Sequence, residues 1–149
     1  MAHSLSFQKQ SYPLVAYNFC VKVDEVSMSF TEVSGISVEN ESVTYRHGRS
    51  FLEGEQIVTF PLDKFRRITC KRGVILGKDP LFLHRWLKSR DLRSMEVSLC
   101  DEVGASVLAW KIAFAVPLSI KAPTFSASTN EAAIDTVELQ ARGISAVVI

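Results

Sequence analysis

The chain has 149 residues, close to the usual size of one domain, and 47% of them are hydrophobic while 22% are charged. Seventeen basic and sixteen acidic side chains leave a net charge of +1, which excludes the strong overall field of a nucleic-acid or membrane-surface binder. The charges are unevenly placed, since residues 24–41 carry five acids and no base, and residues 64–72 carry five bases and no acid. These two blocks are either solvated faces or the two halves of a contact between identical subunits.

Neither a leader nor a membrane span is expected from the sequence. The first thirteen residues, MAHSLSFQKQSYP, have no basic start and no apolar centre, so we expect synthesis in the cytoplasm without a signal peptide. The most apolar window, residues 108–120, is too short to span a bilayer and is interrupted by Lys111 and Pro117. Membrane insertion by this chain alone is therefore not expected.

The first segments alternate as half-buried strands do. Residues 17–23 place Tyr17, Phe19, Val21 and Val23 on one face, and a turn at 24–27 leads into a return strand. Residues 46–56 are predicted to be a loop. Further strands are predicted at 57–60 and 65–72.

The segment from Val33 to Tyr45 is predicted to be one long strand with a bend at Gly35. Its two alternating sets of side chains are both mixed, so a core cannot fix the register of the strand from one face. Such a strand suits a large barrel shared between subunits, with one face lining a wet channel. An ordinary solvent-exposed hairpin is the alternative that the pattern leaves open.

The second half is predicted to contain one helix and three strands. The helix begins with Asp79 as N-cap and Pro80 at its first position, and carries an apolar stripe that includes Trp86. Residues 95–99 and 105–114 are strands joined by a turn at 101–104. Pro117 and Pro123 are expected to bracket an irregular or edge-type stretch. The last strand is predicted over 134–144, with Val137, Leu139 and Ala141 facing inward, and residues 144–149 form an apolar tail.

No catalytic, cofactor or metal site is predicted, and hence no enzyme. The histidines His3, His47 and His84 have no Ser, Cys or Asp neighbour that suggests activation. Residues 73–78 (GVILGK) are one residue too short for a phosphate loop and are not followed by its Ser or Thr. The three cysteines are widely spaced without a C-x-x-C pair, so we expect free core thiols rather than metal ligands.

Several motifs, in their order, resemble the T4-like phage tail-tube family. They are YNFCVKV at 17–23, FTEVSG at 30–35, YRHG at 45–48, ITCKRG at 68–73, Trp86, AWKIAFAVP at 109–117 and STNEAAIDTVEL at 128–139. The resemblance runs from about Tyr12 to Gly143. It implies a mainly β fold, a two-sheet β-barrel or sandwich with one flanking α-helix, as in the tubes of type VI secretion.

The resemblance also implies an assembly and its partners. Subunits of this family form hexameric rings that stack into a hollow tube, and a pair of long hairpins per subunit closes the barrel around the lumen. The implied partners are other copies of the chain, sheath subunits, spike or baseplate proteins, and protein or DNA cargo in the lumen. The expected destination is a particle or virion tail that is released from the cell.

The chain is thus expected to be a single tail-tube domain over 1–149, with residues 1–12 as an N-terminal arm. Residues 49–60 and 144–149 depart from the family pattern, which leaves open a tube-initiating layer next to the spike. A stand-alone ligand-binding or chaperone-like barrel is the alternative of another class. Asn130 and Glu131 are predicted to shape the turn before the last strand. The candidate interface residues are Glu32, Glu39, Glu41, Val43, Tyr45, Arg46, Phe51, Leu52, Arg66, Arg67, Lys71, Arg72, Asn130 and Glu131.

Overall fold

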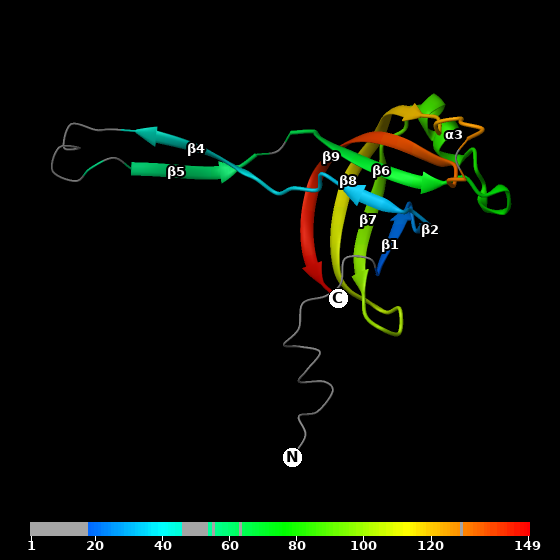
Figure 1. Ribbon diagram of the computed structural model, residues 1–149. Helices are drawn as coiled ribbons and strands as arrows, with labels where there is room; N and C mark the ends of the chain where they lie inside the picture. The colour runs from blue at the N-terminus through cyan, green and yellow to red at the C-terminus, as the bar shows by residue number, and fades with distance from the viewer. Residues whose placement is uncertain (1–17, 46–53, 55, 63, 129) are drawn as a thin grey trace, which may run out of the picture.

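The computed structural model describes residues 18–45, 54, 56–62, 64–128 and 130–149. Within these residues the chain is mainly β, with one α-helix and one turn of 3-10 helix (Figure 1). In chain order the elements are β1 (Phe19–Val23), β2 (Val26–Met28), β3 (Glu32–Ser34), β4 (Asn40–Tyr45), β5 (Gln56–Pro61), β6 (Arg66–Gly73), η1 (Leu76–Lys78), α3 (Phe82–Ser89), β7 (Arg93–Cys100), β8 (Ser106–Lys121) and β9 (Ile134–Val148).

Seven strands form one antiparallel sheet in the order β2-β1-β7-β8-β9-β6-β3. Its central strand is β8, and the neighbouring β9 bends from its contact with β6 round to its contact with the first half of β8 (Figure 1). In the described part of the chain the sheet is not closed, because β2 and β3 each pair on one side only. A second sheet holds only β4 and β5, so the predicted two-sheet fold with a flanking helix is confirmed.

The core is formed by alternating strand residues and by the apolar stripe of α3. Val21 and Val23 of β1 are 1% exposed, as the alternation predicted, and they join Ile68, Met95, Ile112, Val137 and Leu139 in one buried cluster. Leu83 and Trp86 fill the same cluster from α3, three residues apart on one helix face. Burial of each such side chain contributes about 1.5–3 kcal/mol. None of the helices in the described residues is long and apolar enough to cross a membrane.

The helix begins later than the sequence predicted. Asp79 adopts a left-handed conformation with φ of 46° at the end of η1, and Leu81 occupies the N-cap position of α3 without a side-chain cap. The carboxylate of Asp79 pairs instead with Arg85 inside the helix. The reason lies in β6, where the buried Arg72 donates to the carbonyls of Lys78 and Asp79 and thereby fixes this turn.

The predicted strand over 33–45 is divided between the two sheets, so its continuity was wrong. β3 pairs with β6, and β4 pairs only with β5 in a hairpin that projects away from the seven-stranded sheet (Figure 1). The break comes at Gly35, where φ is 92° and an added Cβ would lie 2.8 Å from the carbonyl oxygen of Arg67. The predicted bend at this glycine is confirmed, and glycine is required there because of both the conformation and the close approach.

One prediction near the C-terminus is confirmed and one differs from the structure. The stretch from Pro117 is edge-type and irregular as predicted, although it belongs to β8, because β8 pairs only with β9 beyond Ala115 and the β8–β9 register shifts between Pro117 and Ser119. A bulge of this kind accommodates a residue that has no N–H to donate. The run 144–149 is not a separate tail, because it continues β9 to Val148, which pairs with Leu108. Val148 and Ile149 nevertheless stay exposed.

Candidate subunit interface

One face of the β4–β5 hairpin is mainly apolar, although it includes Glu41, and the other is mainly polar, although it includes Ile57 and Pro61. We call them the apolar and the polar face. Val43 is opposite Val58, and Glu41 is opposite Phe60, so the apolar side chains of the two strands share a face. Val43, Val58 and Phe60 are 46%, 47% and 42% exposed. The other face carries Asn40, Ser42, Thr44, Ile57, Thr59 and Pro61.

This hairpin has little to stabilise it within one chain. It pairs with no strand of the seven-stranded sheet in the described residues, and it extends well clear of that sheet (Figure 1). A two-stranded hairpin alone in water is at best marginally stable, because neither face is covered. Contiguous exposed apolar side chains of this kind mark contact surfaces for a partner.

Three of the candidate interface residues lie in the described part of this hairpin. Glu41 and Val43 are exposed on β4, and Tyr45 ends that strand opposite Gln56. Arg46, Phe51 and Leu52 lie outside the described residues, so their assignment stays a prediction. Val58 and Phe60 are not among the residues predicted from the sequence, because their shared face with Val43 follows from the register between the strands.

The acidic and basic blocks meet within one chain. Arg66 Nη2 lies 2.8 Å from Glu39 Oε2, and Lys71 Nζ lies 3.2 Å from Glu32 Oε2. The pairing of β3 with β6 produces the second contact, since Glu32 is directly opposite Lys71. These pairs give both blocks a role within one chain, besides the two roles expected from the sequence.

The other basic candidates have different surroundings. Arg67 is exposed on β6, with Nη1 3.8 Å from Glu138 Oε2. Arg72 is only 8% exposed, and its guanidinium donates to backbone carbonyls of its own chain. Arg72 therefore serves the fold of this subunit, while Arg67 is accessible to a partner.

Asn130 and Glu131 are both exposed in the segment that leads into β9. The backbone of this segment is tied to the sheet two residues later, where Ala133 O accepts from Val74 N at 3.0 Å. The predicted turn role of the Asn130 and Glu131 side chains stays a prediction.

An apolar corner at η1 was also missed by the sequence analysis. Val74, Ile75 and Leu76 are 42%, 50% and 90% exposed, and Leu81 lies nearby in sequence with its side chain exposed as well. The signal in the sequence was three consecutive aliphatic residues between two glycines, without strand or helix periodicity. We define these four residues as the η1 corner, a second candidate contact surface.

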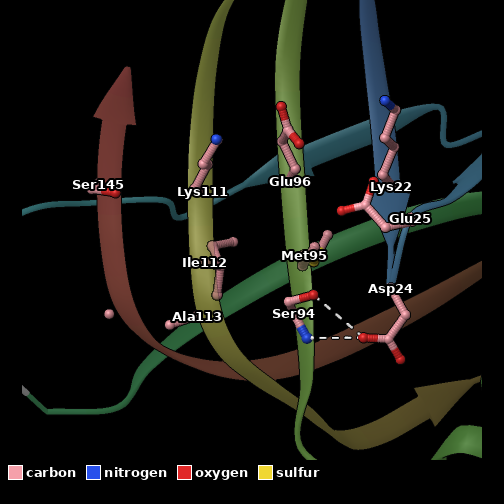
Figure 2. A pocket seen from close by; sticks show the side chains of 11 residues that line it. Lys22, Asp24, Glu25, Ser94, Met95, Glu96, Lys111, Ile112, Ala113 and Ser145 are labelled. Carbon is pink, nitrogen blue, oxygen red and sulfur yellow. Dashed lines mark hydrogen bonds between the residues drawn. The ribbon is translucent and has the colours of Figure 1, made fainter.

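The outer face of the sheet is hollowed over four strands. The hollow, of about 300 Å³, is lined by Lys22, Glu96, Lys111 and Ser145 from β1, β7, β8 and β9 (Figure 2). Asp24 accepts hydrogen bonds from the N–H and hydroxyl of Ser94 at 3.3 Å, at its lower edge in Figure 2. The described residues lining it include no histidine and no cysteine. Within the described chain, no three His, Cys, Asp or Glu side chains gather as a metal site.

Comparisons with known proteins agree with this architecture. The pattern of the family described as T4-like virus tail tube protein gp19 matches residues 15–145. No curated protein sequence matches the chain significantly.

Solved structures match over nearly the whole chain. A chain of the PVC sheath-tube complex, an extracellular contractile injection system in the extended state, has a TM-score of 0.83 and 25% identity, covering 99% of this chain and 100% of that one. A chain of the anti-feeding prophage tube terminating cap has a TM-score of 0.78 and 25% identity, with 93% of each covered. Hcp1 from Flavobacterium johnsoniae, at 19% identity, a TM-score of 0.54 and coverage of 87% and 94%, shows the fold alone.

The family match spans both sheets, the helix and the projecting hairpin. It agrees with the order of motifs noted in the sequence and with the β-rich fold that those motifs implied. This chain belongs to the T4-like virus tail tube protein family and is a tail-tube protein.

Proposed function

We propose that this chain is a subunit of the hollow inner tube of a contractile injection system, and that it forms stacked hexameric rings through which cargo passes. The observation that carries the proposal is the projecting β4–β5 hairpin with its uncovered apolar face. In a ring, that face packs on a neighbouring subunit. The opposite face, rich in hydroxyl and amide side chains, then faces a wet channel.

The open sheet supports the same assembly. Within the described residues, β2 and β3 are short free edges of three residues each. When copies close into a ring, the free sheet edges and the uncovered hairpin of each copy can all be covered by neighbouring copies. A stand-alone ligand-binding barrel has no such need, since it closes on itself.

The partners follow from the same proposal. The structural relatives come from a sheath-tube complex, a tube terminating cap and a baseplate, and we infer contacts of this chain with sheath and baseplate or spike proteins. The overlap with the sheath-tube chain, at a TM-score of 0.83, exceeds that with the baseplate chain, at 0.67. This difference favours the repeating tube subunit over the tube-initiating layer. The assembled particle acts outside the cell in which the chain is made.

The proposed role is structural and not catalytic. The features that the fold presents to its surroundings are an apolar hairpin face, the η1 corner and two sheet edges. Each of them suits contact with another protein surface. A ring gains its stability from repeated copies of such contacts around a closed symmetry.

Two substitutions on adjacent residues test the proposal. Val58→Asp places a charge on the apolar face of the hairpin, and Thr59→Asp places the same charge on the opposite face. Because a charge buried in an apolar contact is costly, Val58→Asp is expected to abolish rings. Thr59→Asp is expected to retain them, since a channel-facing charge stays hydrated and screened.

The readout is mass and shape. Light scattering coupled to size exclusion distinguishes a 16.6 kDa monomer from a hexamer of about 100 kDa, and negative-stain imaging shows rings and stacks. A wild-type protein that stays monomeric at all concentrations overturns the proposal. So does a pair of variants that assemble equally well, because the hairpin faces would then be irrelevant to the ring.

A further inference from the structure

Two of the three cysteines lie in contact on the outer face of the sheet. Cys20 Sγ and Cys100 Sγ are 3.0 Å apart, although 80 positions separate the residues in sequence. Cys20 of β1 is opposite Ser98 of β7, and Cys100 N–H donates to Asn18 O at 2.8 Å. The two thiols therefore occupy diagonal positions on the same face of one strand pair.

The backbone around this pair is held in place from both strands. Asn18 Nδ2 donates to Asp101 O at 2.5 Å and to Cys100 O at 3.3 Å. Asp101 Oδ1 in turn accepts from Val103 and Ala105 N–H at 3.0 Å, which fixes the turn after β7. The sulfurs need to approach by only about 1 Å to reach bonding distance, within the range of side-chain rotation.

The two thiols differ in access, and the third cysteine is separate. Cys20 is exposed, whereas Cys100 is 1% exposed. Cys70 lies in the core on β6 and is 0% exposed, so it cannot exchange with the pair. The described residues supply no third ligand that turns the pair into a metal site.

We propose that Cys20 and Cys100 are a redox-modification site. A small disulfide such as oxidised glutathione oxidises the two thiols to a reversible disulfide within the chain. The exposed Cys20 thiolate attacks one glutathione sulfur, forms a mixed disulfide and releases one glutathione thiolate. The Cys100 thiolate then attacks the Cys20 sulfur of the mixed disulfide and releases the second glutathione thiolate. The cysteine pair loses two electrons, glutathione disulfide gains them, and the two thiol protons pass to the released glutathione.

The chemistry of the pair fits a change of compartment. The hydrogen bond with Cys100, then burial and Coulombic repulsion from the same residue, raise the pKa of Cys20, against a lowering effect of Lys22. Because its pKa is raised, Cys20 attacks disulfides slowly at neutral pH. A cell that keeps glutathione reduced supplies little disulfide, so the pair stays reduced there. In an oxidising medium the bond closes and ties the thin β2–β1 edge of the sheet to β7. The proposal stands on the thiol pair alone and does not depend on ring formation.

The test uses the full chain, reduced and then exposed to oxidised glutathione. Remaining thiols are alkylated after unfolding, counted by intact mass, and linked peptides are mapped. We expect two of the three thiols to be lost from the wild type, with a peptide that joins Cys20 to Cys100. Oxidation should raise the melting temperature by roughly 5–15 °C, because the bond closes a long loop.

Matched variants separate the pair from the third cysteine. Cys70→Ala should still form the bond, and neither Cys20→Ser nor Cys100→Ser should do so. If Cys100→Ser does not fold, Cys20→Ser at the exposed position still decides the question. Three free thiols after oxidation, a stable glutathione adduct on Cys20, or a dimer linked between chains each overturns the proposal.

Discussion

Arg66 Nη2 lies 2.8 Å from Glu39 Oε2 and joins β6 to the residue that precedes the projecting hairpin. The Arg66 side chain is 15% exposed, and Glu39 O also accepts from Leu62 N at 3.1 Å, just after β5. The two ends of the hairpin are thus bonded to each other at Glu39, and Glu39 is joined to the main sheet by Arg66. This contact links the base of the hairpin to the main sheet.

Replacing Arg66 by Gln removes the ion pair at this attachment. We expect the free energy of unfolding to fall by about 1 kcal/mol and ring formation to shift to higher protein concentration, because the hairpin loses a link to the main sheet. Lys71→Gln is the control, since its pair with Glu32 is more exposed on both sides and is expected to contribute less than about 0.5 kcal/mol. Chemical denaturation and sedimentation measure the two effects. Equal assembly of the two variants contradicts the role given to Arg66.

Replacing Gly35 by Ala tests the break between β3 and β4. An added Cβ would lie 2.8 Å from the backbone oxygen of Arg67, in a conformation with φ of 92°. We expect a loss of about 2–4 kcal/mol, since strain and a close contact with backbone add. Gly104→Ala is the matched control, because φ there is 86° but no atom lies within 4 Å of the added Cβ, and we expect about 1 kcal/mol. Thermal unfolding that ranks the two equally contradicts the close approach at Gly35.

The pKa of Cys70 is raised to about 12 by burial in the core. In the unfolded chain this thiol ionises near its ordinary value of 9.0, while the folded chain retains the proton. Alkaline pH therefore favours the unfolded state, by up to about 1.4 kcal/mol per pH unit between about 9 and about 12. In urea titrations under reducing conditions, Cys70→Ala should lose stability less steeply over this window than the wild type. If the free energy of unfolding falls equally steeply with pH in both proteins, the raised pKa of Cys70 is contradicted.

Deleting residues 144–149 removes the last part of β9. Ile144 is opposite Ile112, which is 1% exposed, so the deletion opens the core and leaves this stretch of β8 paired with β7 alone. We expect a loss of at least about 3 kcal/mol in unfolding free energy, or failure to fold. To test whether the C-terminus takes part in the stacking of rings, only its exposed residues should therefore be changed. Val148→Ser with Ile149→Ser should leave the melting temperature nearly unchanged, and a matching loss of stability in both variants contradicts this reading.

The family and the strand content were predictable from the sequence because both depend on patterns of residues that are close together in the chain. Alternation with period 2 located β1, β6, β7 and β9, and the order of short motifs indicated the tail-tube family. The turn at 101–104 was predictable as well, since Asp101 caps it through neighbours in sequence. The start of α3 was not, because Arg72 from another element fixes the preceding turn.

Only the tertiary structure decided which residues meet. The apolar hairpin face depends on the register that sets Val43 against Val58, and alternation within one strand carries no register. The Cys20–Cys100 contact joins positions 80 residues apart, and the ion pair of Arg66 with Glu39 depends on how the chain leaves the sheet. Such contacts arise from pairing and curvature of the whole sheet, which no local pattern specifies.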